Sequence, residues 1–108
     1  MKMHSNDQGG VVTVSLTGEI DLQHSPNLRR QLMDLMFDRR DVLVELAGVS
    51  YIDSSGIACL VEAYQTARKN GTRFVLVAVS APVMRVLQLA RLDKVFALAE
   101  TAEAALAT

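Results

Sequence analysis

The chain is poor in the residues that build disulfides, metal sites and aromatic clusters. Its 108 residues include one cysteine, two histidines and no tryptophan. A single cysteine cannot close an internal disulfide, which fits a reducing compartment. Two histidines and one cysteine are too few for a closed zinc site built from nitrogen and sulfur ligands. We therefore expect no disulfide, no bound metal and no cofactor.

The chain also lacks an excess of either charge and a long apolar run. Eleven basic and 12 acidic side chains give a formal net charge of −1, which lacks the electrostatic footprint of a nucleic-acid or acidic-membrane binder. The longest uninterrupted apolar run covers 74–79, whereas a bilayer span needs about 20 residues. Residues 1–7 lack the apolar stretch of a secretory signal. We expect a cytoplasmic protein with no nucleic acid and no membrane among its partners.

The composition that remains is globular. Half of the residues are apolar, and the length fits one domain over 1–108. A chain of this size can bury roughly two-thirds of its unfolded surface, so a core can hold it without cross-links. No apolar stripe is evident outside the predicted core, and we therefore expect a monomer.

Strand-like and helix-like segments alternate along the chain. Apolar and β-branched runs predict strands over 11–16, 42–47, 74–79 and 95–99, and residues 2–6 are a candidate first arm of a hairpin. Apolar spacing predicts helices from residue 25 to about 37–39, over 54–70, after residue 80 and after residue 101. Short connections of this kind favour an α/β fold, with a mixed, mainly parallel sheet of 4–5 strands and about four helices.

Local signals indicate where these helices begin and which side they bury. Ser25 before Pro26 is typical of a helix cap, Ser80 is predicted to cap the third helix, and Thr101 is expected to start a small Ala-rich helix. The segment 48–53 is predicted to be a loop that leads into the helix over 54–70. The apolar positions predicted for the buried side of that helix are Ile57, Leu60, Val61, Tyr64 and Ala67. Cys59 on the same helix is interpreted as inert packing.

The most informative segment runs from Tyr51 to Ile57. Asp53, Ser54 and Ser55 follow an apolar stretch, and a predicted helix begins directly after them. The N–H groups and dipole of a helix start favour an anion, and sites gather beyond the carboxyl ends of parallel strands. Two interpretations stay open at this point, because Asp53 and Ser54 can equally well serve only as helix caps.

A second polar cluster, 18–21, also lies between a predicted strand and a predicted helix. If the two strands are neighbours in the sheet, Asp21 comes close to Asp53 and Ser54. The alternative interpretation of this cluster is a solvated turn.

The residue types of a hydrolase triad are present, but their arrangement does not support catalysis. Ser54, His24 and either Asp21 or Asp53 supply the types, whereas the G-x-S-x-G elbow is absent. Asp53 adjoins the serine where a base is needed, and His24 has no evident orienting partner. Walker A and dinucleotide-binding fingerprints are also absent. We expect a protein that is not an enzyme.

Two segments resemble the paired signatures of the STAS domain, and within it those of bacterial anti-sigma factor antagonists. They are Leu-Thr-Gly-Glu-Ile-Asp at 16–21 and Val-Ser-Tyr-Ile-Asp-Ser-Ser-Gly at 49–56. Residues 81–87 and 92–96 are similar to later segments of the same family. The family often has Leu-Gly after the motif glycine, where this chain has Ile-Ala at 57–58. The resemblance covers nearly the whole chain and implies the STAS fold.

The resemblance implies a partner switch controlled by phosphorylation. In the family, the serine after the aspartate, here Ser54, is phosphorylated by an anti-sigma factor that is itself a GHKL-type serine kinase. The unmodified antagonist binds this kinase, which then releases its target. The phosphorylated antagonist lets go of the kinase, and a PP2C-type phosphatase removes the phosphate and restores the binding form. The family's acidic contact in the first motif falls on Asp21. The residues that we expect to bind the partner are Asp21, Asp53, Ser55, Gly56, Ala58 and Glu62.

Other interpretations of these segments stay open. The outward side of the second helix, which carries Ala58, Glu62, Gln65 and Lys69, is as consistent with an ordinary solvated helix as with a contact surface. A different function class is a STAS accessory subunit of an ABC lipid transporter. Ser54 argues against that class, because those relatives tend to have threonine or another residue at the switch position. A nucleotide-binding sensor lacks a phosphate-cradling loop here.

Overall fold

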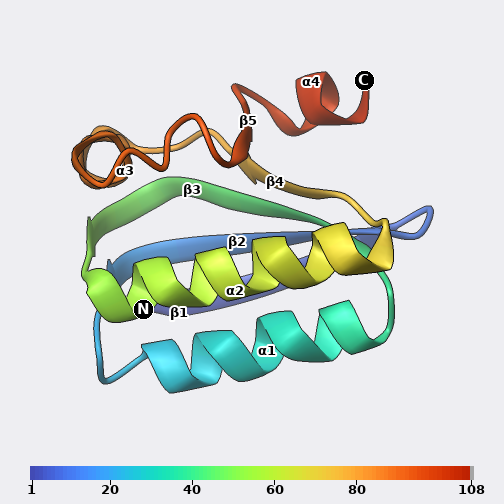
Figure 1. Ribbon diagram of the computed structural model, residues 1–108, viewed down its shortest axis with the longest axis horizontal. Helices are drawn as coiled ribbons and strands as arrows, with labels where there is room; N and C mark the ends of the chain where they lie inside the picture. The colour runs from blue at the N-terminus through green and yellow to red at the C-terminus, as the bar shows by residue number, and fades with distance from the viewer. Residues whose placement is uncertain (108) are drawn as a thin grey trace.

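A computed structural model describes residues 1–107 (Figure 1). Its elements are β1 (Lys2–Gln8), β2 (Val11–Ile20), α1 (Ser25–Phe37), β3 (Asp41–Ile52), α2 (Ser54–Asn70), β4 (Phe74–Val77), α3 (Ala81–Leu89), β5 (Ala97–Ala99) and α4 (Ala102–Leu106). The predicted order of strands and helices is confirmed, including the first arm of the hairpin, which extends to Gln8.

The strands form one sheet in the order β1-β2-β3-β4-β5. β1 and β2 pair antiparallel through a turn at Gly9 and Gly10, whose φ angles of 61° and 87° suit glycine. The pairs β2–β3, β3–β4 and β4–β5 are parallel. The predicted mixed, mainly parallel sheet is therefore confirmed, and the carboxyl ends of β2 and β3 lie side by side.

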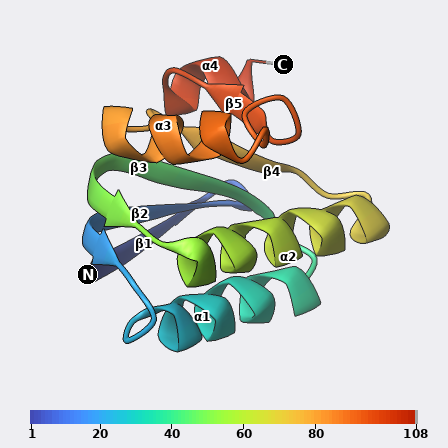
Figure 2. The same ribbon diagram turned by 60° about the vertical axis from the view of Figure 1, so that its left-hand side comes forward.

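The strands lie between two pairs of helices. Figures 1 and 2 show α1 and α2 next to each other on one side of the strands, with α3 and α4 on the other side. Leu28 of α1 and Leu60 of α2 are fully buried against the sheet. Leu43, on the opposite face of β3, packs in a smaller cluster with Ala105 of α4. β3 is therefore covered on both faces.

Helix α2 buries the side that its apolar spacing predicts. Ile57, Leu60 and Ala67 are buried, and Tyr64 packs edge-on against Phe96, with 5.4 Å between ring centroids. The helix ends at Gly71, whose φ of 71° is the left-handed conformation of a helix C-cap. None of the helices within residues 1–107 is long and apolar enough to span a bilayer.

The predicted loop over 48–53 is wrong, because β3 continues to Ile52. In the pairing with β2, Ser15 lies opposite Glu45 and Thr17 opposite Gly48, so β3 contains an extra residue. A second shift lies between Gly18 and Glu19. These bulges interrupt the apolar alternation that identifies a strand, although they keep the strand paired. β3 therefore extends directly to Asp53, and no loop separates it from the helix.

The predicted cap at Ser25 is wrong, and the predicted cap at Ser80 is right in position but not in its side-chain bond. α1 begins at Ser25 itself and has His24 at its N-cap; Ser25 is only 4% exposed, and its carbonyl accepts the Cys59 Sγ–H at 3.3 Å. Ser80 stands at the N-cap of α3, but its hydroxyl donates to the Val49 carbonyl at 2.6 Å. Thr101 does cap α4, by accepting the Ala104 N–H at 3.0 Å. Tertiary contacts decide what the two serines bind.

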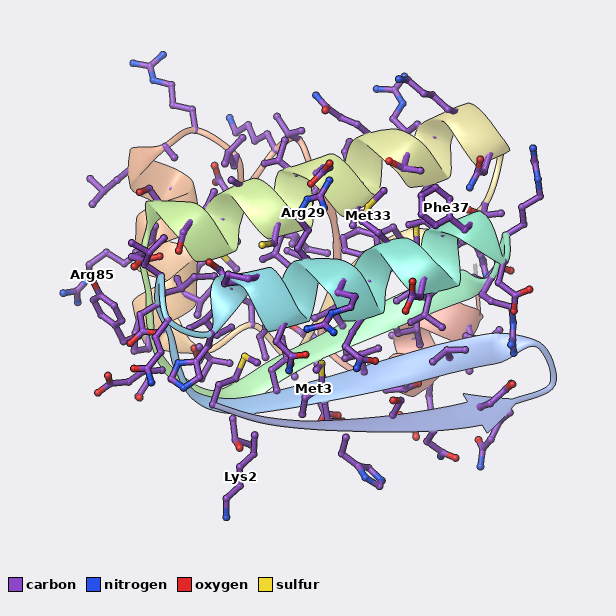
Figure 3. The ribbon with its side chains drawn as sticks, turned by 90° about the horizontal axis from the view of Figure 1, so that it is seen from below. Lys2, Met3, Arg29, Met33, Phe37 and Arg85 are labelled. Carbon is purple, nitrogen blue, oxygen red and sulfur yellow. The ribbon has the colours of Figure 1, made fainter. Side chains whose placement is uncertain are left out.

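Smaller differences concern strand ends and the first strand. β4 ends at Val77 and β5 begins only at Ala97, so both are shorter than the apolar runs. In β1, the half-buried Met3 packs against the core, while the adjacent Lys2 is exposed and points away from the helices (Figure 3). β1 therefore covers the open edge of β2, and Met3 is the only residue of this strand that is not exposed.

Candidate functional site

The ends of β2 and β3 meet at the start of α2. The Asp53 N–H donates to the Ile20 carbonyl at 3.1 Å, and the Leu22 N–H donates to Asp53 Oδ2 at 3.1 Å. These two bonds place the segment after β2 directly beside the segment after β3. The prediction that the cluster containing Asp21 neighbours Asp53 and Ser54 is confirmed.

Asp53 is the centre of this junction. Its Oδ1 accepts the Ser55 N–H at 2.9 Å, the Gly56 N–H at 3.2 Å and the Ser55 hydroxyl at 2.5 Å, while Oδ2 accepts the Leu22 N–H. The hydrogen bond from the Ser55 hydroxyl lowers the pKa of the Asp53 carboxyl; the loss of solvent opposes this, and the backbone donors add to it. Asp53 is thus ionised and fixed at neutral pH.

The anion site predicted at this helix start is occupied by a carboxylate of the chain itself, that of Asp53. The N–H groups of Ser55 and Gly56, the second and third residues of α2, both donate to the Asp53 carboxylate. The capping interpretation is therefore confirmed for Asp53. It is wrong for Ser54, which is the first residue of the helix and caps nothing.

The two serines differ in environment although they are adjacent. Ser55 is half-buried and its hydroxyl donates to Asp53. Ser54 is exposed, and within residues 1–107 no group makes a hydrogen bond with its hydroxyl. Of these two hydroxyls, that of Ser54 is therefore the one open to a reagent or an enzyme approaching from solvent.

Asp21 closes the other side of the junction. Its Oδ1 accepts the Gln23 N–H at 3.1 Å and the His24 N–H at 3.2 Å, and it lies 2.7 Å from His24 Nδ1. The loss of solvent raises the pKa of Asp21, but the hydrogen bonds and the attraction from His24 outweigh it, so the pKa lies below its ordinary value. Two ionised carboxylates, Asp21 and Asp53, consequently lie on the two segments that meet at this junction.

The Asp21 contact corrects the expectation that His24 has no orienting partner. No hydrogen bond within the described chain joins His24 to Ser54, so the nucleophile–base contact of a triad is not formed there. The same residues 1–107 contain no group of three or more His, Cys, Asp and Glu side chains placed to hold a metal. These side chains form a polar surface at the start of α2.

Gly56 lies beneath this surface. It is buried, and a Cβ at this position would lie 2.7 Å from Ile20 Cγ2 and 2.7 Å from Ile52 Cγ1. A side chain there would push α2 away from the ends of β2 and β3. Gly56 is also expected among the partner contacts, and its burial gives it a packing role in the free protein.

On the outer side of α2, Glu62 is held by a residue that the sequence analysis did not single out. Arg29 of α1 binds it in a bidentate pair, Nε to Oε1 at 2.7 Å and Nη2 to Oε2 at 2.8 Å. The hydrogen bond from Arg29 is the main reason why the pKa of Glu62 is lowered. Ala58, Gln65 and Lys69 are exposed on the same helix. Helical spacing cannot reveal this pair, because its partners are 33 residues apart.

A cavity of about 370 Å³ lies between the first turns of α1 and α2. It is lined by Ser25, Pro26 and Arg29 from α1, and by Ser55, Ala58, Cys59 and Glu62 from α2. Figure 3 shows Arg29, Met33 and Phe37 in succession along the side of α1 that lies next to α2. We call this cavity the α1–α2 pocket; nothing in the sequence pattern predicts it.

Comparisons with known proteins agree on one family. A family model described as STAS domain matches residues 2–105. An anti-sigma-B factor antagonist of Bacillus subtilis (strain 168) is 28% identical over 103 residues, which cover 95% of this chain and 91% of that protein. The crystal structure of an anti-sigma factor antagonist from Mycobacterium paratuberculosis is 31% identical, has a TM-score of 0.88, and matches 98% of this chain and 91% of its own.

A more distant structure shows the fold alone. The Bacillus cell fate determinant SpoIIAA, solved in its phosphorylated form, is 19% identical with a TM-score of 0.78, over 97% of this chain and 96% of its own.

Proposed function

This chain belongs to the STAS domain family and is similar to its anti-sigma factor antagonists, and from this premise we propose that it is an antagonist switched by phosphorylation of Ser54. In its unmodified form it binds an anti-sigma factor that is a GHKL-type serine kinase, and the kinase then releases its target. Phosphorylation of Ser54 ends the binding, and a PP2C-type phosphatase restores it.

The observation that carries this proposal is the difference between the two serines. Ser54 is exposed with an unengaged hydroxyl among the described residues, whereas Ser55 donates its hydroxyl to Asp53 at 2.5 Å. A kinase must reach the oxygen that it phosphorylates and must deprotonate it. A kinase can reach the Ser54 oxygen without any rearrangement, because Ser54 is exposed and Asp53 binds the hydroxyl of Ser55 instead.

Electrostatics supports a switch at this position. A phosphate adds about −1.5 to −2 charges, and at Ser54 it lies near the ionised Asp21 and Asp53. The positive end of the α2 dipole tolerates this charge in the free protein, so the fold is preserved. A partner surface built for a neutral hydroxyl between carboxylates does not tolerate it. Like-charge repulsion of that kind is expected to lower affinity about a hundredfold.

The proposed contact surface follows from the same geometry. Asp53 and Ser55 flank Ser54 in the chain, and Asp21 lies on the segment that Asp53 holds through Leu22. Ala58 and Glu62 continue the surface along α2. Gly56 supports it from below by allowing α2 to lie close to Ile20 and Ile52. The partner thus contacts the segment after β2 and the first two turns of α2.

The proposal is tested by a phosphorylation assay with a GHKL-type serine kinase from the same genome. The protein is incubated with the kinase and ATP and then weighed by intact-mass spectrometry. We expect one phosphate on the wild-type protein, none on Ser54→Ala, and one on the matched control Ser55→Ala. Undiminished phosphate on Ser54→Ala would show that another residue is the acceptor.

A further inference from the structure

We propose that the α1–α2 pocket receives an apolar side chain from the same partner that phosphorylates Ser54. This inference rests on the proposed function and adds to it a second point of attachment. It identifies the occupant as a protein side chain with apolar character, next to a basic residue.

The pocket exists because small side chains meet at the first turns of both helices. Ser25 and Pro26 of α1 face Ser55, Ala58 and Cys59 of α2, and the Arg29–Glu62 pair crosses between the helices at the next turn. Its volume of about 370 Å³ is at the small end of ligand pockets. That is sufficient for a bulky side chain to enter from the open surface.

Most polar side chains in the wall of the pocket already have partners. Ser55 donates its hydroxyl to Asp53, the Cys59 thiol donates to the Ser25 carbonyl, and Arg29 binds Glu62 through two nitrogens. Within the described chain, no fully buried side-chain nitrogen or oxygen lacks a hydrogen bond. A polar small molecule would find few free groups to orient it here, whereas an apolar side chain displaces none of these bonds by entering.

The pocket lies next to Ser54, so the kinase that binds Ser54 also supplies the side chain that enters the pocket. Ser55 is part of the pocket wall, and Ser54 is the adjacent residue. An enzyme that seats Ser54 in its active site must cover the first turn of α2, and the pocket begins on that turn. The apolar side chain therefore comes from the surface that holds Ser54, and no third protein is required.

The charge around the pocket indicates what flanks this side chain. The charged residues of the pocket wall, Arg29 and Glu62, neutralise each other in a bidentate pair. Asp53, which accepts the hydroxyl of the wall residue Ser55, adds a negative charge directly beside the pocket. A basic residue beside the inserted side chain complements this charge.

The test fills the pocket from its exposed wall. Ala58→Leu places a branched side chain at the mouth of the pocket and keeps a strong helix former. Gln65→Leu makes the same addition at an exposed position of α2 outside the pocket and is the matched control. Binding to the GHKL-type kinase from the same genome is measured by calorimetry with unphosphorylated protein, and each fold is checked by circular dichroism. If Ala58→Leu loses the native circular dichroism spectrum, Ala58→Met takes its place in the binding measurement.

We expect Ala58→Leu to weaken kinase binding about tenfold or more, and Gln65→Leu to leave it unchanged. If Ala58→Leu and the wild-type protein bind the kinase with equal affinity, the pocket receives no side chain of the kinase, while the proposed phosphorylation switch is unaffected. Equal weakening by both leucine variants would also overturn this role of the pocket, because added apolar bulk anywhere on α2 would then suffice. If the kinase neither binds nor phosphorylates the wild-type protein, the proposed function itself is wrong.

Discussion

The Asp53 carboxylate accepts the hydroxyl of Ser55 at 2.5 Å and leaves the hydroxyl of Ser54 in solvent. Through its second oxygen the same carboxylate holds the Leu22 N–H. One side chain therefore caps α2, fixes the segment after β2, and distinguishes between two adjacent serines. This arrangement leads to the following predictions.

Replacing Ser54 with aspartate should imitate the charge of the phosphate. We expect Ser54→Asp to weaken binding to the kinase about tenfold or more, with an unchanged circular dichroism spectrum, because the helix start accepts the charge and the partner does not. Ser54→Asn has nearly the same size without the charge. If the asparagine variant binds as weakly as the aspartate variant, steric fit and not charge controls the interface.

Removing the Asp53 carboxylate should release Ser55. Asp53→Ala loses the N-cap of α2, and we expect Tm to fall by about 4–8 °C. Because the Ser55 hydroxyl is then free, phosphopeptide mapping after treatment with the kinase should detect phosphate on Ser55 as well as on Ser54. Asp53→Asn retains a capping oxygen and should keep most of the stability. Phosphate confined to Ser54 in the alanine variant would contradict this role of Asp53.

The lowered pKa values of Asp21 and Asp53 predict a loss of stability in acid. Their folded-state pKa values lie below those of the unfolded chain, so their contribution is complete above the unfolded value of about 3.9. It declines as the pH falls through the lower folded values. Urea unfolding between pH 7 and pH 2 should show this decline, and Asp53→Asn should show a smaller one. An equal decline in both proteins would assign the acid sensitivity to other carboxylates.

Adding a methyl group at Gly56 should destabilise the fold. The Cβ would lie 2.7 Å from atoms of Ile20 and Ile52, which are buried and cannot move aside freely. We expect Gly56→Ala to lower the free energy of unfolding by about 1–3 kcal/mol, despite the higher helix propensity of alanine. Denaturant unfolding measures the change, and Ser54→Ala, on the same turn but exposed, should be near neutral. A neutral Gly56→Ala would show that α2 can shift outward at no cost.

Leu22 should contribute to partner binding because it is exposed beside the switch. Its side chain is 72% exposed while its backbone is bound to Asp53, so a partner can bury it without ordering the loop first. We expect Leu22→Ala to weaken kinase binding several-fold, as truncation of a buried interface side chain does. Leu89, which is 81% exposed at the end of α3, provides the control Leu89→Ala. Similar effects of both variants would exclude a specific role for Leu22.

The sequence predicts most of the fold because its elements are marked by local signals. The apolar spacing of α2 and the glycine turn between β1 and β2 needed no tertiary information. The end of β3 could not be predicted, since its bulges at Gly48 and beyond are defined only by pairing with β2. Ser25 and Ser80 resembled caps, but tertiary packing buries one and directs the other to Val49.

The site was predictable to the extent that it depends on strand ends. Neighbouring parallel strands bring their carboxyl ends together, so the proximity of Asp21 and Asp53 followed from element order. The engagement of Ser55 by Asp53 depends on rotamers, and the Arg29–Glu62 pair depends on how α1 lies against α2. The α1–α2 pocket likewise requires the relative position of two helices, which no local pattern specifies.

The central claim is that Ser54 alone receives the phosphate, and site-resolved mass spectrometry tests it most directly. The wild-type protein, Ser54→Ala and Ser55→Ala are each incubated with the GHKL-type serine kinase and ATP, digested, and sequenced by tandem mass spectrometry. The account predicts phosphate on Ser54 in the wild-type and Ser55→Ala proteins, and no phosphate on Ser54→Ala. Phosphate on Ser55 of the wild-type protein, or an unmodified wild-type protein, would contradict it.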